Sequence, residues 1–193
     1  MVSLAIFASG GGSNAERITK HFYGHKQIQI ELFITNNPDS GVISIGKNYH
    51  IESICLSKKQ LMNGEFLYNL LNERNIDGII LAGYLLKIPD ELIKSYPDKI
   101  INIHPSLLPK YGGKGMYGMH VHDAVYSNNE KISGMTIHIV NEVYDEGRIL
   151  FQAVCPIKPN WTASEIAKGV LALEHKFFAT VIEKHFLGID INT

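Results

Sequence analysis

Short hydrophobic runs alternate with amphipathic stretches through the first half of the chain. The runs are rich in β-branched and aromatic residues and are bounded by turn residues, which is typical of strands. Between them, apolar residues recur at the three- and four-residue spacing of a helix face. We predict strands at about residues 2–8, 28–35, 51–56, 77–82 and 99–104, and helices at about residues 14–24, 40–49, 64–74 and 89–96.

The pattern changes in the second half of the chain. Two further strands are predicted at about residues 133–140 and 148–157, and their close succession favours an antiparallel pair. Thr162 and Glu165 then form a capping-box sequence, and apolar residues follow at helical spacing. A long amphipathic helix is therefore predicted after Thr162.

The alternation of strands and helices is typical of right-handed βαβ units. We predict an α/β fold with a Rossmann-like, mainly parallel twisted sheet, helices on both faces, and a C-terminal antiparallel addition plus a long helix. No repeat, low-complexity tract or linker interrupts the pattern. A single domain over residues 1–193 is expected, with an N-terminal half of about residues 1–100 and a second half of about residues 101–193.

Composition narrows the class of protein. At 193 residues the chain can bury a core without disulfide or metal cross-links. Its net charge of −1 provides no basic field for nucleic acid or an anionic membrane, and no apolar run approaches the roughly 20 residues that cross a bilayer. Cys55 and Cys155 lie far apart and suit a reducing compartment. We therefore expect a cytoplasmic protein with neither a nucleic-acid nor a membrane partner.

A glycine-rich turn, Ser9–Asn14, follows the first predicted strand and opens the first predicted helix. Three consecutive glycines let the backbone approach a ligand closely, and the free amides of a helix N-terminus attract phosphate. The sequence matches neither the P-loop nor the dinucleotide fingerprint, since Ala15 stands where the latter needs its third glycine. The turn is either a candidate phosphate site or simply a tight turn. For Asn14, the alternative to a binding role is the ordinary role of a helix N-cap.

The predicted strand at 99–104 carries Asn102 and His104 on one face, because side chains alternate along a strand. Pro105 ends that strand and keeps His104 extended. An amide donor beside a titratable imidazole can stabilise an oxyanion and move a proton. The alternative is a loop cap or an ordinary buried histidine.

Two downstream segments add candidate chemistry. Gly112–Met119 contains four glycines and is a candidate lid, or else an exposed connector. The turn after the strand at 133–140 contains Asp145, which would orient His104 and favour its cationic form if it folds back onto that ring. His120 and His122 would share a face if extended, but no cluster of further ligands accompanies them, so we expect no metal site.

Taken together, Gly10–Asn14, Asn102–Lys110 and Asp145 resemble the glycinamide ribonucleotide formyltransferases, folate-dependent enzymes of purine biosynthesis. The resemblance covers essentially the whole chain in matching order. The sequence Asn-Ile-His-Pro-Ser-Leu-Leu-Pro at 102–109 is a specific signature of formyltransferases that use 10-formyltetrahydrofolate. The resemblance implies transfer of a formyl group from 10-formyltetrahydrofolate, as co-substrate, to the amine of glycinamide ribonucleotide. It also implies small-molecule partners, no metal, and a monomer or homodimer.

The resemblance also implies roles for matching residues, with phosphate binding in the N-terminal half and folate binding and catalysis in the second half. The catalytic residues would be Asn102, His104 and Asp145. Those binding phosphoribosylglycinamide would be Gly11, Gly12, Ser13, Asn14 and Glu174. Those lining the folate site would be Leu85, Leu86, Lys87, Ile88, Asn102, Asn141, Glu142, Val143, Tyr144 and Asp145.

The chain departs from the family pattern at two places. The Gly112–Met119 loop is longer than in the usual family form, and Gly64 stands where an arginine is expected near the glutamate tail of the folate. Binding of the tail would then rely on Lys58, Lys59 or another lysine, or be weaker.

Three other functions stay open at this point. One is a formyltransferase with another amine acceptor, such as methionyl-tRNA, although such an enzyme needs a basic RNA-binding surface. Another is a formyltetrahydrofolate hydrolase, which is expected to carry a regulatory domain before this core. The third is a non-catalytic folate- or phosphoribosyl-binding module, since a shared fold does not guarantee a shared reaction.

Overall fold

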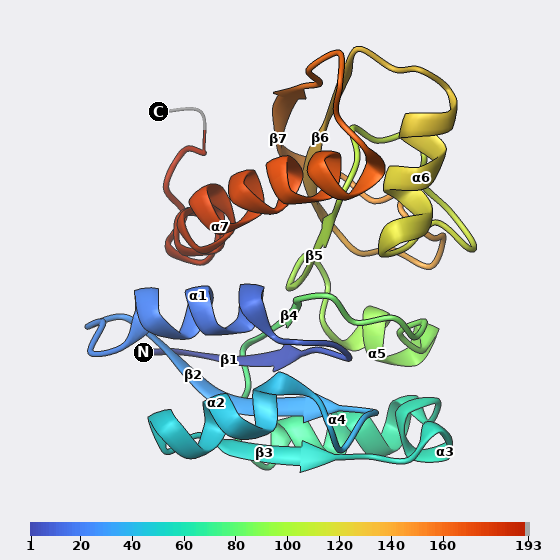
Figure 1. The fold of residues 1–193 in the computed structure, drawn as a ribbon. Helices are drawn as coiled ribbons and strands as arrows, with labels where there is room; N and C mark the ends of the chain where they lie inside the picture. Colours follow the sequence, from blue (N-terminus) through green and yellow to red (C-terminus); the bar gives the residue numbers. More distant parts are fainter. Residues whose placement is uncertain (192–193) are drawn as a thin grey trace. The chain divides into compact units, whose positions relative to one another are not determined.

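The computed structural model describes residues 1–191, and its strands and helices follow the predicted alternation (Figure 1). The contacts divide the chain into two compact units, Met1–Ile101 (unit 1) and the residues from Asn102 onward (unit 2). The division falls inside strand β5 (Ile100–His104), close to the expected division of the chain. The expectation of a single domain stays a prediction.

Unit 1 contains a parallel arrangement of four strands. Their bounds are β1 Val2–Phe7, β2 Ile28–Thr35, β3 Glu52–Cys55 and β4 Gly78–Leu81. β1 pairs with β2 on one side and with β4 on the other, and β2 pairs with β3, all in parallel. Every residue of β1 from Ser3 to Phe7 is buried, because a parallel strand at the centre of a sheet is covered on both faces.

The helices of unit 1 lie on both faces of these strands. Their bounds are α1 Ser13–Phe22, α2 Gly41–Tyr49, α3 Lys58–Leu61, α4 Gly64–Asn72 and α5 Asp90–Ser95. The chain moves outward from β1 to β3 and then returns to β4, so right-handed crossovers place α1 and α2 on one face and α4 on the other. In agreement, α1 packs against α2 and α4 against α5.

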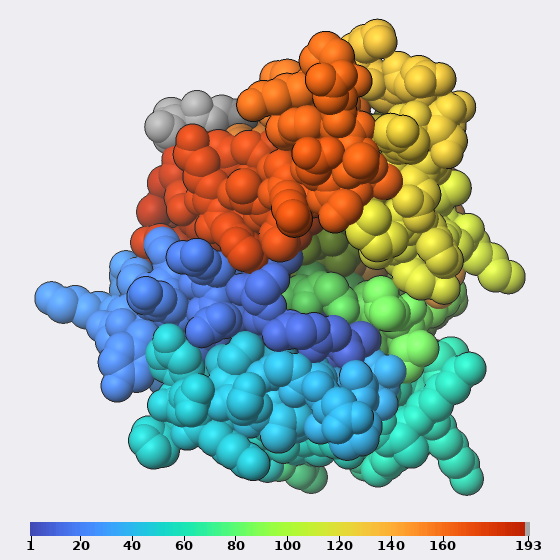
Figure 2. Space-filling model, in the orientation of Figure 1, coloured from blue at the N-terminus to red at the C-terminus, as the bar shows by residue number. Residues whose placement is uncertain are grey.

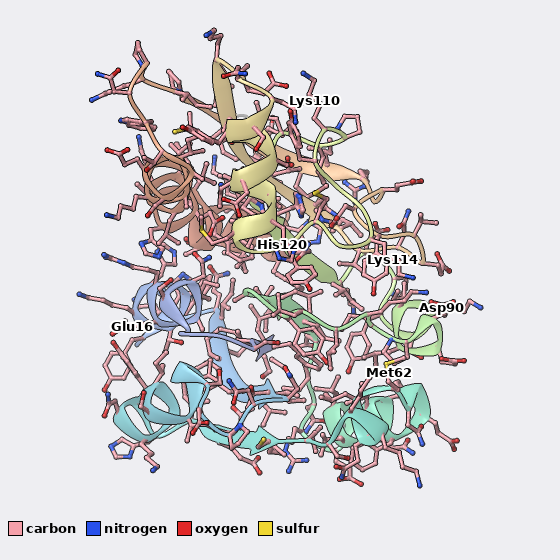
Figure 3. The ribbon with its side chains drawn as sticks, turned by 45° about the vertical axis from the view of Figure 1, so that its right-hand side comes forward. Glu16, Met62, Asp90, Lys110, Lys114 and His120 are labelled. Carbon is pink, nitrogen blue, oxygen red and sulfur yellow. The ribbon has the colours of Figure 1, made fainter. Side chains whose placement is uncertain are left out.

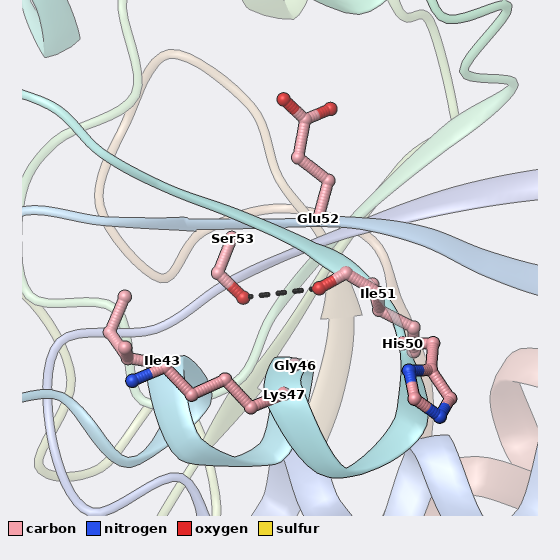
Figure 4. A pocket seen from close by; sticks show the side chains of 7 residues that line it. All are labelled: Ile43, Gly46, Lys47, His50, Ile51, Glu52 and Ser53. Atoms are coloured by element: carbon pink, nitrogen blue, oxygen red, sulfur yellow. Dashed lines mark hydrogen bonds between the residues drawn. The ribbon is translucent and has the colours of Figure 1, made fainter.

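The packing of α2 on β3 is unusually close. A Cβ at Gly46 would lie 2.0 Å from Ser53 Oγ, so only glycine fits there. Figure 4 looks into the shallow depression beside this contact, where Ser53 Oγ donates to the carbonyl of Ile51 at 3.5 Å.

Unit 2 contains β5, the antiparallel pair β6 Ile132–Ile139 and β7 Ile149–Pro156, and two helices, α6 Met119–Ser127 and α7 Ala163–Leu187. α7 packs against β6, β7 and α6. In Figure 2 the red atoms of α7 lie beside the orange atoms of the segment that precedes it. α7 begins with the predicted capping box, in which Thr162 accepts from the Glu165 amide and the Glu165 carboxylate accepts from the Thr162 amide.

The strands form a seven-stranded sheet in the order β3-β2-β1-β4-β5-β6-β7, mainly parallel with an antiparallel pair at one end, as predicted. Among residues 1–191, no helix is both long and apolar enough to cross a membrane.

The structure also corrects the sequence interpretation. The short helix α3 and the longer α6 were not predicted, and α6 places His120 and His122 on a helix rather than an extended segment. α1 begins at Ser13 after Gly12, whose φ of 77° is left-handed, so Asn14 is not the N-cap. The turn of the backbone at Gly12, rather than a side-chain cap, starts the helix.

Candidate active site

The end of β5 presents an amide and an imidazole next to β6. Asn102 and His104 lie on one face of β5, and His104 is 4% exposed. Asn102 Nδ2 lies 3.1 Å from Nε2 of His138, a residue of β6 that is 2% exposed. Three polar side chains therefore line the buried junction of these two segments.

The turn after His104 is fixed by Thr136 on β6. Thr136 Oγ1 donates to the carbonyl of Ser106 at 2.6 Å and accepts from the amide of Leu108 at 3.0 Å. Gln152 of β7 donates to Thr136 Oγ1 at 2.9 Å and to the carbonyl of Leu108 at 3.0 Å. These buried bonds hold the chain that leaves β5, and hence His104, in one position.

Asp145 does fold back onto His104. The side chain of Asp145 is mostly buried, with 11% of it exposed, whereas the other two acids of this turn, Glu142 and Glu146, are exposed. Its Oδ2 lies 3.5 Å from His104 Nδ1, and its Oδ1 lies 3.7 Å from His138 Nε2. The φ of Asp145 is 59°, a left-handed conformation that aspartate tolerates better than most residues. The carboxylate is thus held between two imidazoles.

The start of the glycine loop is tied to these residues. His104 Nε2 donates to the carbonyl of Tyr111 at 2.8 Å, and the Gly113 amide donates to Asp145 Oδ2 at 2.8 Å. The Tyr111 hydroxyl donates to Glu130 at 2.9 Å, as does the ammonium of Lys110. The expectation of a lid stays a prediction, but this end of the loop is bonded rather than open to solvent.

Both ring nitrogens of His104 face acceptors, and this bears on its pKa. Burial is the largest effect and lowers the pKa of His104, and the charge of His138 lowers it further. Asp145 and the Tyr111 carbonyl raise it, as expected, but they do not offset burial. The resting ring is therefore mainly neutral near pH 7, with its proton on Nε2 because a carbonyl can only accept.

The pKa of Asp145 is lowered. Burial alone would raise it, but the contact with His138, the charge of His104 and the Gly113 amide together outweigh burial. The carboxylate is ionised at neutral pH and available to accept a proton.

Sequence reasoning did not single out His138. Its signal was present, since it lies two residues after Thr136 on a predicted strand that precedes Asp145. A single histidine inside a strand is nonetheless indistinguishable from ordinary core without the fold.

In unit 1, the glycine-rich turn is fixed from two sides. The carbonyl of Gly10 accepts from the Gly41 amide and from Ser40 Oγ, both at 3.0 Å. On the other side, Ser9 Oγ accepts from the Leu85 amide at 3.1 Å. Gly10, Gly11 and Ser13 are exposed, and a Cβ at Gly10 or Gly11 would meet nothing within 4 Å. The turn therefore leaves open space beside the first amides of α1.

The other expected binding residues have different settings. Glu174 lies on α7 and is 7% exposed. Between β4 and α5, Leu85 is exposed, Ile88 is buried, and Lys87 pairs with Asp90 at 2.8 Å. In the turn at 141–145, Val143 and Tyr144 are exposed and the Val143 amide donates to Asn141 Oδ1.

Gly64 has a packing reason of its own. It begins α4, and a Cβ there would lie 2.7 Å from Cβ of Glu91 on α5. A larger residue cannot fit without moving one helix. Lys58 and Lys59 lie exposed on the neighbouring α3.

The histidine pair on α6 is not arranged for a metal. His120 is exposed and His122 is 6% exposed, because residues two apart point to different sides of a helix. Figure 3 labels His120, near the start of α6, and Lys114, in the loop before that helix. Within residues 1–191, no group of three or more histidine, cysteine or acidic side chains could hold a metal ion.

Relatives of known name match nearly all of this chain. A phosphoribosylglycinamide formyltransferase of Bacillus subtilis is 34% identical over 195 residues, covering 98% of this chain and 97% of the relative. The chloroplastic phosphoribosylglycinamide formyltransferase of Arabidopsis thaliana is 40% identical over 185 residues, covering 93% of this chain. The chain spans 63% of that plant relative and 59% of the one from Vigna unguiculata.

Solved structures and a family model agree with these relatives. A crystal structure of phosphoribosylglycinamide formyltransferase from Anaplasma phagocytophilum superposes with a TM-score of 0.85 at 31% identity, covering 94% of this chain and 85% of that one. The family model described as formyl transferase matches residues 2–182. The chain belongs to the formyl transferase family.

Proposed function

We propose that this chain transfers a formyl group from 10-formyltetrahydrofolate to the amine of glycinamide ribonucleotide. The observation that carries the proposal is the convergence of Asn102, His104 and Asp145 in a chain whose relatives bear the name of this reaction. Family membership gives the reaction class, and the three side chains supply groups that the reaction needs. Two free cysteines fit the proposed cytoplasmic location.

In the reaction, the amine attacks the formyl carbon and a C–N bond forms while the carbonyl oxygen becomes an oxyanion. An N–H of Asn102 stabilises this oxygen, and Asp145 accepts, directly or through His104, the proton that the amine releases. The negative charge increases the proton affinity of His104 as it develops, so the ring gains a proton during the reaction although burial lowers its resting pKa. The tetrahedral intermediate then breaks its bond to the folate nitrogen, which takes up a proton.

Binding is proposed for the remaining residues. Gly11, Gly12, Ser13 and Asn14 hold the phosphoribosyl part through backbone amides, and Glu174 binds its ribose hydroxyls. Leu85–Ile88 and Asn141–Asp145 line the folate site. The open space at Gly10 and Gly11 and the exposed apolar side chains of Leu85, Val143 and Tyr144 support this division.

The test mixes the purified chain with glycinamide ribonucleotide and 10-formyl-5,8-dideazafolate and follows deformylated product by absorbance. Turnover that needs the acceptor is expected. Asn102→Ala and His104→Ala should each lose about 10²–10³ in turnover because an oxyanion donor or proton carrier is gone, whereas Lys47→Ala, an exposed change on α2, should not. Product formed without acceptor would indicate a hydrolase, and no product would indicate a binding module.

A further inference from the structure

His138 belongs neither to the residues that the resemblance implies nor to the catalytic trio. The β6–β7 register shifts opposite this residue: Ile137 pairs with Phe151 and His138 with Ile149, so Leu150 of β7 is the extra residue. Such irregularities often lie beside functional sites. The ring of His138 is buried at 2% exposure and contacts both Asn102 and Asp145. A buried titratable ring in this position needs a role.

The backbone fixes which nitrogen of this ring carries the proton. His138 Nδ1 lies 3.0 Å from the carbonyl of Ile139, and a carbonyl can only accept. Gly147 lies directly against that carbonyl, since a Cβ there would overlap it. Nδ1 therefore carries a hydrogen, and in the tautomer that has this hydrogen alone, Nε2 presents its lone pair.

The lone pair of Nε2 selects one orientation of the Asn102 amide. An asparagine amide has two orientations of nearly equal shape, which exchange oxygen and nitrogen. When Asn102 Nδ2 faces His138, the lone pair of His138 Nε2 accepts one N–H of the amide, and the two nitrogens lie 3.1 Å apart. The reverse orientation would place Asn102 Oδ1 against the lone pair, acceptor against acceptor. The ring with its hydrogen on Nδ1 alone thus holds Asn102 with its second N–H committed as a donor.

Asp145 and His104 both interact electrostatically with His138. Asp145 Oδ1 lies 3.7 Å from Nε2, and the charge of His104 interacts with that of His138, while His122 interacts with His104. A protonated His138 would direct an Nε2–H to Asp145 and lose its acceptor for Asn102. The same nitrogen therefore cannot serve both neighbours at once.

We infer that His138 is a positioning residue that sets the orientation of the Asn102 amide, so that an Asn102 N–H rather than its oxygen faces the formyl oxygen. This inference rests on the proposed function. It assigns no contact with substrate to His138, and its effect is exerted through Asn102.

A matched pair of variants tests the inference. In His138→Gln the side-chain amide reaches the position of Nε2 and can accept from Asn102, whereas in His138→Asn it reaches only the position of Nδ1 and keeps the contact with Ile139. His138→Gln should stay within about 10-fold of wild-type kcat, and His138→Asn should lose about 10²-fold with little change in KM. The double variant Asn102→Ala/His138→Asn should have nearly the same kcat as Asn102→Ala alone, because both changes remove the effect of the same donor.

Nitrogen-15 spectra of labelled histidine give a readout apart from activity. The signals that disappear in His138→Gln should be those of a ring protonated at Nδ1 at pH 8. A proton on Nε2 instead, equal losses in the two variants, or fully additive losses in the double variant would overturn the inference. An inactive wild-type protein with the expected Nδ1 proton would refute the proposed function but leave the tautomer assignment intact.

Discussion

At the scale of single residues, the central feature of unit 2 is a carboxylate held between two imidazoles. The oxygens of Asp145 lie 3.5 Å from His104 and 3.7 Å from His138, and its backbone occupies a left-handed conformation to reach them. Such a conformation costs of order 1–3 kcal/mol, and it persists only when the surroundings determine it. The Gly113 amide, 2.8 Å from Oδ2, is part of those surroundings.

Asp145→Asn tests the charge of this carboxylate at constant size. Turnover should fall by about 10²–10³ because the proton acceptor is lost. Since Asp145 raises the pKa of His104, removing its charge should lower that pKa further, as measured by the pH dependence of the His104 ring resonances. Glu146→Gln, an exposed acid that follows Asp145 directly and has no assigned role, is the control. An unchanged His104 titration in Asp145→Asn would contradict the coupling.

The site was partly predictable at this scale. Asn102 and His104 could be identified because strand alternation and Pro105 fix their common face in the sequence itself. The approach of Asp145 depends on the β6–β7 pairing and on one positive φ, neither of which a local pattern encodes. The partner of His104 Nε2 is a backbone carbonyl, which every residue possesses, so no sequence signal distinguishes Tyr111.

At the scale of elements, glycines decide how closely segments approach one another. A Cβ at Gly41, the first residue of α2, would lie 2.0 Å from the carbonyl oxygen of Gly11. Because the obstructing atom is backbone, it cannot move aside without shifting the glycine-rich turn. The start of α2 thus sets the shape of the turn that precedes α1.

Gly41→Ala should therefore lower the free energy of unfolding by about 1–3 kcal/mol, as overpacking usually does, measured by urea denaturation. Gly10→Ala is the matched control, since a Cβ there meets nothing within 4 Å, and its effect should stay within about 0.5 kcal/mol. Equal stability of the two variants would show that the turn adapts freely.

Elements with a clear apolar pattern were predicted, including the four-residue strands β3 and β4, whereas two helices without such a pattern were not. β2 was predicted at residues 28–35 and spans Ile28–Thr35, because its apolar run is long and clearly bounded. α6 was missed because its buried residues, Val121, His122 and Val125, include only two apolar side chains, and glycines precede it. α3 has four residues, too few for any periodicity to emerge.

At the scale of the whole molecule, buried histidines link stability to pH. Burial lowers the pKa of His104 and of His122 in the folded chain. In the unfolded chain their pKa is about 6.5. Between that value and the lower folded values the unfolded chain binds more protons, so stability falls as pH falls. Carboxyl groups whose pKa is lowered in the folded chain, such as that of Asp145, also reduce stability as pH falls, but only at more acidic pH.

The urea concentration at half-unfolding should therefore decrease from pH 7.5 to pH 5.5, with each histidine contributing at most about 1.4 kcal/mol per pH unit. His122→Phe removes one of the two titrations together with a buried Nδ1 that has no hydrogen-bond partner. It should reduce the pH dependence. A midpoint that rises toward pH 5.5 would reverse the sign and refute the assignment.

The bond between His104 Nε2 and the carbonyl of Tyr111 has a consequence for selectivity. At rest the Nε2–H of the ring is already donated to the Tyr111 carbonyl, so under the proposed function any substrate group that needs this proton competes with an internal oxygen for it. Giving up that bond costs about 1 kcal/mol, and Glu130 tethers Tyr111 against easy displacement. A bound donor and acceptor can offset this cost through their other contacts with the protein. The resting bond therefore favours ligands held at several points over a molecule that makes a single contact.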